Sequence, residues 1–379
     1  MRKLLAREFP QDQEVIYLNH AAVAPWPLRT CEAVRAFAWE NTHTGARDYS
    51  RWMAREMTLR KQLQQLINAP SVRDIAFTKN TSEAISLVAC GIEWHPEDNI
   101  VTTDEEFPSN RIPWQAQAAY GVELREVPIH LPEPELALIG ACDRNTRLLT
   151  VSSVQYGSGI RLDLELLGRH CREQGILFCV DAIQSIGAVD FDVQTVGADF
   201  VMADGHKWML GPEGLALFYS TPEARDCLRL HQYGWHMTAS AGNFDQRDWR
   251  IADSALRFEC GSPNMLGIHA LSASISLLLE IGMQEITRLV LEKTTYLYER
   301  MATIAGIHFL TPREAQRRAG ILGFRIHSVD NPILHRKLLE QGVICAQRGG
   351  GIRFSPHFYT SLSKLDSAIE ILNKTLCDM

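Results

Sequence analysis

The sequence has few of the features that mark membrane-spanning, secreted or metal-binding proteins. No apolar stretch approaches the length of about 20 residues that spans a bilayer. The first ten residues contain no apolar core long enough for a signal peptide. The nine cysteines lack the Cys-x-x-Cys spacing of metal sites, and most of them lie among apolar residues. We therefore expect a cytoplasmic protein whose cysteines are reduced.

Basic residues are also too few and too dispersed for a protein that binds polyanions. The 38 lysines and arginines are outnumbered by 45 aspartates and glutamates, which gives a net charge of −7, and no long basic run occurs. We therefore expect neither nucleic acid nor an anionic membrane surface as a partner. The length of 379 residues and the apolar share of 46% are instead typical of a globular protein with two or three domains.

One lysine lies where enzymes commonly place a reactive amine. Residues 200–203 (Phe-Val-Met-Ala) form an apolar run that predicts a buried strand, and a turn at 204–205 and then Lys207 follow directly. Open α/β sheets bind their ligands at such strand ends. Apolar neighbours would lower the pKa of the amine, as a Schiff-base lysine requires. The alternative is a solvated surface lysine, which is the common state of this residue type.

A second apolar run favours the reactive lysine over the surface lysine. Residues 175–180 have the length of a buried strand and end in Asp181. A carboxylate that closes such a strand is costly unless it is paired or lies at the mouth of a site. Pyridoxal phosphate (PLP) needs this combination, because a lysine must bind it covalently and an acid must keep its pyridine nitrogen protonated. Lys207 and Asp181 together therefore indicate a PLP site.

The two segments resemble a known cofactor signature. Val-Asp-Ala-Ile-Gln-Ser at 180–185, followed by Gly-His-Lys at 205–207, is similar to the signature of the class V aminotransferases. These fold-type I PLP enzymes include cysteine desulfurases, selenocysteine lyases and isopenicillin N epimerases, and the resemblance runs from about Tyr17 to the C-terminus. The resemblance implies that PLP is the cofactor and that Lys207 is the catalytic residue that forms the aldimine. It also implies that Asp181 stabilises the pyridinium and that Gln184 and His206 bind the cofactor.

Further cofactor contacts follow from the same resemblance. Thr81 and Ser82 open a predicted helix, where amides and hydroxyls suit a phosphate, although simple N-capping would use the same residues. Phe107 takes the place of the histidine that stacks on the cofactor in desulfurases, with a core phenylalanine as the alternative. Ser262 matches a hydroxyl residue that reaches the phosphate of the neighbouring subunit's cofactor. This last match implies a homodimer with shared active sites.

The substrate contacts are expected to come from three other segments. Glycines at 349–351 precede Arg353, and the resemblance assigns to its guanidinium the α-carboxylate of the substrate, with a surface arginine on a hairpin as the alternative. Tyr156 replaces a family asparagine near the cofactor and substrate. His20 lies in a small-residue segment that lines the substrate site in the family, with a plain loop as the alternative. The histidines of the loop over 231–256 have no carboxylate or cysteine at ligand spacing, so no metal is expected.

Strands alternate with helices through residues 74–219, which predicts an α/β fold with a largely parallel sheet between two layers of helices. The resemblance implies the PLP-dependent transferase fold type I. It places a seven-stranded sheet in a large PLP-binding domain over 16–282 and a small α+β C-terminal domain over 283–379, which the N-terminal arm over 1–15 joins. We expect the active site between these domains and at a dimer interface. The pattern also predicts a helix capped by Thr30, one helix over 111–120 and an apolar helix over 265–281.

The expected activity is that of a PLP-dependent enzyme, similar to class V aminotransferases, that acts on an amino acid through the Lys207 aldimine and a quinonoid. A carbon–sulfur lyase of the cysteine desulfurase or selenocysteine lyase type, an amino-acid epimerase and a non-catalytic protein of the same fold are the alternatives. Desulfuration is disfavoured, because Phe107 cannot move protons and Cys345 lies in an apolar run rather than in an exposed loop. Asp204 would repel a phosphate unless it turns away or His206 compensates for its charge.

Overall fold

The computed structural model describes residues 1–12 and 14–379 of the chain. The predicted N-terminal arm over 1–15 contains residue 13, which lies outside the described residues. The arm begins with helix α1 (Arg2–Glu8), and a short strand, β1 (Ile16–Tyr17), follows it.

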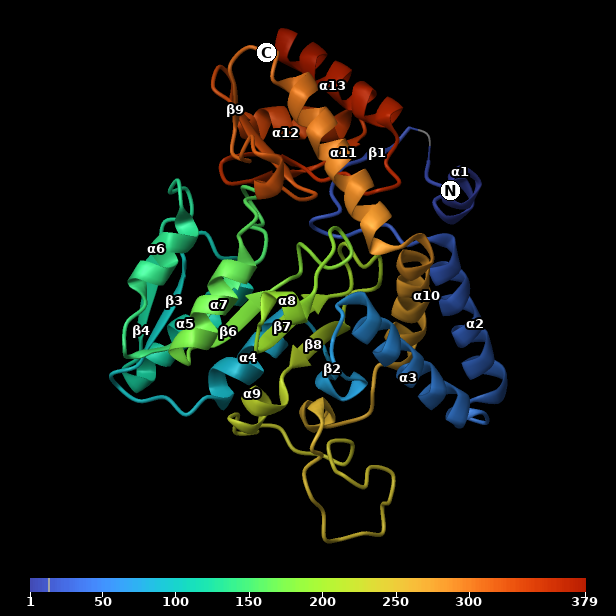
Figure 1. Ribbon diagram of the computed structural model, residues 1–379. Helices are drawn as coiled ribbons and strands as arrows, with labels where there is room; N and C mark the ends of the chain where they lie inside the picture. Colours follow the sequence, from blue (N-terminus) through green and yellow to red (C-terminus); the bar gives the residue numbers. More distant parts are fainter. Residues whose placement is uncertain (13) are drawn as a thin grey trace.

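A seven-stranded sheet forms the centre of the molecule (Figure 1). Strand β8 runs antiparallel to both of its neighbours, and the other six strands are parallel to one another. The predicted largely parallel sheet is therefore confirmed. In spatial order the strands are β2 (Ile75–Thr78), β8 (Ala216–Ser220), β7 (Phe200–Asp204), β6 (Leu177–Asp181), β5 (Thr146–Ser152), β3 (Asn99–Thr103) and β4 (Glu123–Val127).

Helices cover both faces of this sheet, because successive side chains of each strand point to opposite faces. In β7, Phe200 and Met202 join one apolar cluster, and Val201 and Ala203 join the other. The first cluster includes residues from α4 (Thr81–Gly91), α5 (Ile112–Gln115) and α9 (Pro222–Asp226). The second includes residues from α3 (Tyr49–Leu66), α6 (Pro134–Ala141), α7 (Leu164–Gln174), α8 (Val193–Val196) and α10 (Met265–Ile281).

The C-terminal part of the chain forms a separate layer above the large sheet (Figure 1). Its four-stranded antiparallel sheet has the order β12-β13-β10-β9. Its strands and helices are α11 (Met283–Met301), β9 (Ile307–Phe309), β10 (Leu322–Ile326), α12 (Asn331–Glu340), β11 (Val343–Ile344), β12 (Ala346–Arg348), β13 (Gly351–Phe354) and α13 (Leu362–Cys377). Strand β1 pairs with β11, and Ile16 and Leu18 pack in the apolar core of this part. Residues 16–18 thus lie with the C-terminal part, although the sequence places them in the range of the large domain.

Two local predictions differ from the structure. Helix α2 (Leu28–Thr44) begins before Thr30, which lies inside the helix and bonds to the hydroxyl of Ser274 at 2.6 Å instead of capping it. The predicted helix over 111–120 is divided into α5 and a 3₁₀ segment, η3 (Ala116–Tyr120). Helix α10 has the predicted bounds.

No single helix of the described residues is long and apolar enough to cross a membrane. Helices α10 and α11 meet the requirement of length and composition only as a pair, and this pair is bent by 86°.

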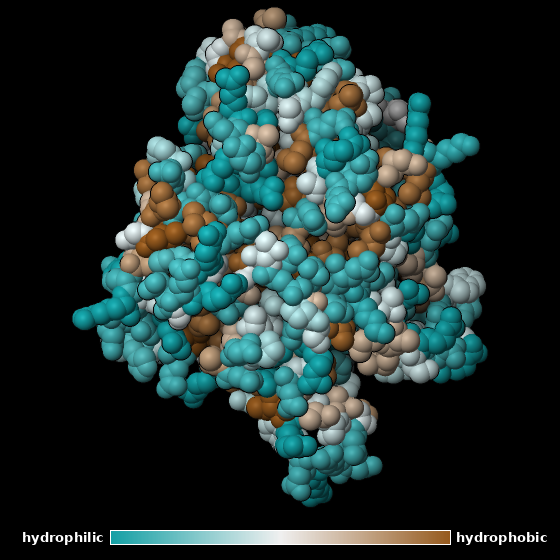
Figure 2. Space-filling view, in the orientation of Figure 1, coloured by the Kyte–Doolittle hydropathy of each residue, from teal (hydrophilic) through white to brown (hydrophobic). Residues whose placement is uncertain are grey.

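The loop between α9 and α10 projects from the end of the large sheet that is opposite the C-terminal part (Figure 1). Figure 2 shows hydrophilic residues over most of the visible face, with apolar residues gathered where the C-terminal part meets the large sheet. This junction is also where the predicted site residues come together.

Candidate active site

A cavity of about 320 Å³ opens at the carboxyl ends of β6 and β7, and segments from both ends of the chain complete its wall. Such a crevice at strand ends is the usual place for a ligand in an open α/β sheet. Nine of the eleven predicted site residues line it: Thr81, Ser82, Phe107, Tyr156, Asp181, Gln184, His206, Lys207 and Arg353.

Lys207 lies in the loop that follows β7 and is 9% exposed. Burial lowers the pKa of its amine, and the neighbouring charge of Asp181 opposes this shift. Gly187 packs directly against the backbone of this loop. It has φ +92°, and a Cβ added there would lie 2.3 Å from the carbonyl oxygen of Trp208. A residue with a side chain at 187 would therefore displace the segment that carries Lys207.

Asp181 ends β6 and is 2% exposed. Burial raises the pKa of its carboxyl, whereas the hydrogen bond from the amide of Ile183 (3.0 Å) and the charge of Lys207 lower it. Two buried groups of opposite charge thus stabilise each other's ionised forms inside the cavity. This is the pair that the sequence predicts for a PLP site.

The side chain of Gln184 has a fixed orientation. Its Oε1 accepts a hydrogen bond from the indole of Trp208 at 2.8 Å, and its Nε2 donates to the carbonyl of Ala21 at 3.1 Å. Because an indole nitrogen can only donate, the oxygen of the amide must face Trp208. The second hydrogen of Nε2 is left for a ligand in the cavity.

The hydrogen bonds at the start of helix α4 show which residue caps the helix and which hydroxyl is left for a ligand. Asn80, not Thr81 or Ser82, caps the helix, since its Oδ1 accepts from the amide of Glu83 at 2.9 Å. The Thr81 hydroxyl is buried and has no hydrogen-bond partner in the described part of the chain. The Ser82 hydroxyl donates to Ser109 at 2.8 Å. First-turn amides have no acceptor within a helix, so this end offers several donors to an anion.

The side chains of Asp204 and His206 lie together at the cavity wall. Oδ1 of Asp204 is 3.0 Å from Nδ1 of His206, although the two atoms are not aligned for a well-formed hydrogen bond. The imidazole of His206 is thus the basic group that lies next to the carboxylate of Asp204. The contact therefore favours the explanation in which His206 compensates for the charge of Asp204 over the one in which Asp204 turns away from the site.

Phe107 turns its ring into the cavity rather than into the core. The ring is 37% exposed and meets that of Tyr156 edge-on at 5.1 Å between centroids. Nζ of Lys207 lies 5.6 Å from the centre of the Phe107 ring. An exposed aromatic face beside the lysine suits stacking on a planar ligand.

Glu106 is a buried carboxylate beside the cavity that none of the sequence predictions includes. It is 4% exposed and lies between the end of β3 and Phe107. Its carboxylate accepts hydrogen bonds from the side chains of Thr103, Asn110, Ser152 and Gln155 and from the amide of Ser152. Its negative charge also raises the pKa of Asp181. Three acidic residues, 104–106, follow the predicted strand over 99–103, and the sequence does not tell which of them turns inward.

Arg353 is a buried cation without a counter-ion. It is 2% exposed, and its guanidinium donates to the carbonyl of Tyr156 at 2.7 Å and approaches Oδ1 of Asn19 at 3.5 Å. Burial and the nearby charge of Arg348 lower its pKa to about 9. Within residues 1–12 and 14–379 it forms no ion pair with a carboxylate. Because an unpaired buried charge is costly, the site is complementary to an anion.

His20 and Ser262 do not line this cavity. His20 is fully buried, and its ring nitrogens bond to the carbonyl of Ser355 and the hydroxyl of Tyr359, both at 2.7 Å. Burial lowers its pKa to about 4, so the ring is a neutral structural link between the two ends of the chain rather than a substrate contact. Ser262 lines a separate hollow beside Lys79 and Cys260. Its predicted role, a contact with the neighbouring subunit's cofactor, requires a partner chain and stays a prediction.

Cys345 is 4% exposed, and burial raises the pKa of its thiol to about 12. A nucleophilic cysteine needs an accessible thiolate. The structure therefore agrees with the expectation that Cys345 is a core residue.

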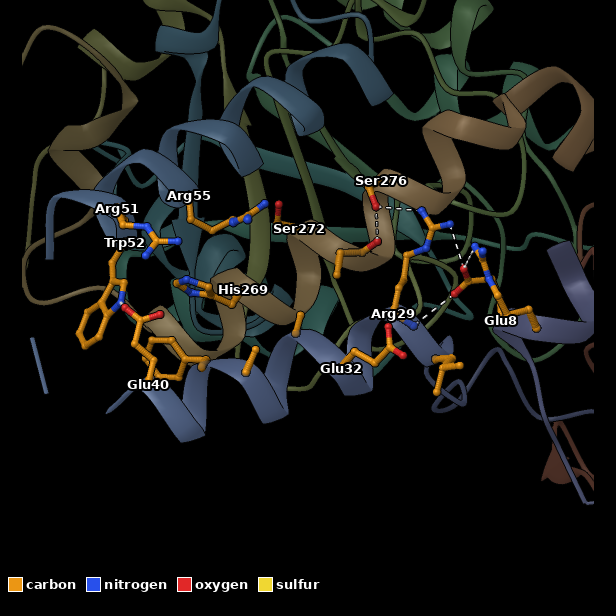
Figure 3. A pocket seen from close by; sticks show the side chains of 16 residues that line it. Glu8, Arg29, Glu32, Glu40, Arg51, Trp52, Arg55, His269, Ser272 and Ser276 are labelled. Atoms are coloured by element: carbon orange, nitrogen blue, oxygen red, sulfur yellow. Dashed lines mark hydrogen bonds and ion pairs between the residues drawn. The ribbon is translucent and has the colours of Figure 1, made fainter. Parts of the chain in front are cut away.

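A larger cavity of about 730 Å³ lies elsewhere, among α1, α2, α3 and α10 (Figure 3). Arg29 enters it, but its charge is paired with Glu8 at 3.0 Å and Glu280 at 2.7 Å. None of the described residues that line it is a lysine, so it cannot bind PLP covalently.

Glu56, His236 and Glu259 also gather ligand-type atoms, from three distant segments whose spacing could not reveal them. Arg60 lies among them and pairs with both carboxylates at 2.7 Å. Its guanidinium already supplies the positive charge that the two carboxylates require. We interpret this cluster as an internal ion-pair network.

The family of the chain follows from comparisons with known proteins. A model for the family "Aminotransferase class-V" matches residues 16–363. The chain belongs to the class V aminotransferases. This class V protein is 31% identical to a probable cysteine desulfurase of Methanothermobacter thermautotrophicus, over 98% of this chain and 96% of the relative.

Solved structures support the same assignment. The apo cysteine desulfurase of Thermococcus onnurineus NA1 is similar with a TM-score of 0.88 and 25% identity, over 99% of this chain and 98% of the other. The cystine C–S lyase C-DES, solved with cysteine persulfide as its reaction product, has a TM-score of 0.88 at 22% identity, over 96% of this chain and 99% of the other. At this lower identity the likeness shows the fold. The predicted family, the fold type I, the PLP cofactor and the enzyme class of PLP-dependent transferases and lyases are thus confirmed.

The residues of the cavity fit PLP. The unpaired Thr81 hydroxyl and the amides at the start of α4 suit its phosphate, and the exposed ring of Phe107 suits its pyridine ring. Asp181, Gln184 and Lys207 supply a carboxylate, an amide hydrogen and an amine to the same cavity. The assignment of each residue to one atom of the cofactor stays a prediction.

Proposed function

We propose that this class V enzyme binds the α-carboxylate of an amino acid at Arg353 and moves the proton of the α-carbon with Lys207. The observation that carries the proposal is the buried Arg353, without a carboxylate partner among the described residues, in the same cavity as the buried Lys207. A guanidinium binds a carboxylate through two parallel hydrogen bonds, which fixes the orientation of the substrate as well as its position. The amino acid then presents its α-carbon to the amine.

Several residues of the chain prepare this proton transfer. When bound, PLP supplies an aldehyde that captures the substrate amine and a pyridinium ring that accepts electron density from the α-carbon. Burial lowers the pKa of Lys207, so that its amine can accept and return a proton near the operating pH. Asp181 supplies the negative charge that keeps a pyridine nitrogen protonated, and the ring of Phe107 offers a surface for stacking.

We propose β-elimination as the reaction type, with a substrate that carries a leaving group on its β-carbon. Lys207 takes the α-proton, the leaving group departs from the β-carbon, and hydrolysis of the remaining enamine yields pyruvate and ammonia. Elimination needs no other acid or base than this lysine. The names of the relatives, cysteine desulfurase and cystine C–S lyase, support carbon–sulfur cleavage. The buried Cys345 argues against a persulfide on this cysteine as an intermediate.

The test is to mix the PLP-loaded enzyme with amino acids that carry or lack a β-leaving group and to follow the cofactor spectrum and the products. We expect pyruvate and ammonia from cysteine or β-chloroalanine, without any added keto acid. Accumulation of pyridoxamine phosphate would instead show transamination, and an unchanged spectrum with every amino acid would contradict amino-acid binding. Lys207→Ala should abolish product formation and the covalent fixation of PLP by borohydride. Lys293→Ala, at a lysine of α11 that is 6% exposed, is the control for loss of a buried lysine.

We further propose a homodimer in which Ser262 completes the partner's site. The position of Ser262 supports this, because it is exposed and lies outside the cavity of its own chain. Lys207→Ala and Ser262→Trp subunits should each be inactive alone. After joint refolding, the hybrid dimers should contain one intact site and recover activity. No recovery, with dimers shown by light scattering, would contradict a shared site.

We propose a reducing compartment, the cytoplasm, as the location. All nine cysteines are unpaired, which suits such a compartment. Fractionation of cells that produce the tagged protein tests this, and recovery from an oxidising compartment would contradict it.

A further inference from the structure

A second guanidinium faces the substrate end of the cavity. Arg348 ends β12, and Arg353 lies on β13, the antiparallel partner strand. Ala346 is directly opposite Arg353 in this pairing. Since side chains two positions apart share a face of a strand, Arg348 lies on the same face as Arg353 and is its diagonal neighbour. Both arginines line the cavity.

The turn between the two strands fixes this arrangement. Gly349 and Gly350 have φ +57° and +71°, which is the left-handed region at both central positions of a two-residue hairpin. Residues with a Cβ are strained there. Arg325, on the neighbouring strand β10, donates from Nε to the carbonyl of Gly349 at 2.9 Å and holds the turn from outside the cavity.

The two guanidinium groups repel each other without compensation. Among the neighbouring charges, that of Arg348 is the main one that lowers the pKa of Arg353. Arg348 bonds only to the carbonyl of its neighbour Gln347, at 2.7 Å, and no described carboxylate lies within ion-pair distance of either arginine. Glu213 also lines the cavity but forms no ion pair with Arg348 in the described part of the chain. Like charges held together in a cavity are typical of a site that awaits anions.

One α-carboxylate neutralises one of these two cations. Arg353 is the buried member of the pair and is braced by Tyr156 and Asn19, so the α-carboxylate belongs there. Arg348 is exposed and lines the same cavity, so it is left to meet another part of an amino acid whose α-carboxylate is held at Arg353. Of the other acids that line the cavity, Asp204 lies 3.0 Å from His206 and Asp181 lies beside Lys207, so neither neutralises Arg348.

We propose that Arg348 selects amino acids whose side chain ends in an anion, either a carboxylate or a sulfur oxyanion. This inference rests on the proposed binding of an amino acid at Arg353, and it names the class of substrate. A planar carboxylate and a pyramidal sulfinate both present two anionic oxygens. Both can therefore accept two hydrogen bonds from one guanidinium.

The test compares matched pairs of amino acids: aspartate with asparagine, and cysteine sulfinate with cysteine. The dissociation constant of each is measured from the change in the spectrum of the PLP-loaded enzyme, and kcat/KM is measured where turnover occurs. In the unaltered enzyme we expect tighter binding of the anionic member of at least one pair, and the better pair tells carboxylate from sulfinate. Arg348→Gln should reduce this preference by about 10- to 100-fold, the range for a lost charge-assisted bond. Arg348→Lys should restore part of it.

Arg336→Gln is the matched control, because it removes an exposed guanidinium from α12 that lies outside the cavity and makes no contact with this turn in the described part of the chain. It should keep the preference for anionic side chains. Equal loss for anionic and neutral amino acids in Arg348→Gln would overturn the inference and show that both arginines share the α-carboxylate. Weaker binding of PLP itself in this variant would also overturn it, in favour of the cofactor phosphate. If no amino acid changes the spectrum of the unaltered enzyme, the proposed function fails together with the inference.

Discussion

The indole nitrogen of Trp208 donates a hydrogen bond to Oε1 of Gln184 over 2.8 Å. The residue that follows Lys207 thus sets the orientation of the amide of Gln184, which lines the same cavity. Trp208 is fully buried, so this bond does not compete with water. The side chain of Trp208 therefore positions Gln184, and the backbone of Trp208 is joined directly to that of Lys207.

Replacement of Trp208 by phenylalanine tests this coupling. The variant leaves the buried Oε1 of Gln184 without its donor, which costs about 1–3 kcal/mol and allows the amide to rotate. We expect a shifted absorbance maximum of bound PLP and a lower affinity for it. Trp114→Phe is the control, since Trp114 is also buried and donates to Asn110 at 2.9 Å. Equal spectra for the two variants would contradict a positioning role of Trp208.

The pH dependence of PLP capture should report the charge of Asp181. Capture needs the free amine of Lys207, whose pKa burial lowers below the ordinary value of 10.5, while Asp181 raises it again. The capture rate should therefore rise with pH and reach its midpoint below 10.5. Asp181→Asn removes the opposing charge, so the midpoint should move to lower pH, as measured by rapid-mixing absorbance. Asp199→Asn, at a half-buried acid outside the cavity that accepts from the amide of Phe178 at 2.9 Å, should leave the midpoint in place.

Asp204→Ser tests whether His206 offsets the charge of the aspartate. The two side chains face each other at 3.0 Å, and the variant removes a carboxylate from a site that binds a phosphate. We expect the affinity for PLP to stay within about threefold of the original or to improve, because little net repulsion is left to remove. Equilibrium dialysis measures it. A large loss would show that Asp204 makes a favourable contribution of its own.

Cys345 should be inert toward thiol reagents in the folded enzyme. Its pKa of about 12 leaves almost no thiolate near pH 8, and the thiol is buried. Iodoacetamide should label the exposed cysteines at 31, 90, 227 and 377 at least about 100-fold faster. Cys345→Ser should keep the activity toward amino acids. Persulfide on Cys345 during turnover, detected by mass spectrometry, would contradict this.

The sequence predicted the large sheet and the centre of the site for the same reason. Strands β6 and β7 are apolar runs, Asp181 ends the first, and Lys207 follows the second after a short turn. Parallel strands bring their carboxyl ends to one edge, so local signals were sufficient to bring these residues together. The antiparallel direction of β8 could not be predicted, because an apolar run is the same whichever way the strand lies in the sheet.

Other features of the site depend on partners far away in the chain. His20 was expected near the substrate, but Ser355 and Tyr359, more than 300 positions later, hold its ring in the core. Capping by Asn80 rather than Thr81 depends on which of two competing oxygens reaches the amide of Glu83. Thr30 was expected to cap a helix, but its hydroxyl forms a hydrogen bond with the hydroxyl of Ser274 instead. Local preferences show that such residues can cap a helix or accept a hydrogen bond. Which partner each one actually has depends on tertiary packing.

The cavity wall joins Asn19 to Arg353, residues that are 334 positions apart. On the ribosome, the strands that carry Asp181 and Lys207 are therefore complete long before the hairpin with Arg348 and Arg353 is translated. A chain released before β12 contains Asp181 and Lys207 but lacks both arginines that line the cavity. Synthesis thus adds the two arginines of the cavity last, after both strands that carry Asp181 and lead to Lys207.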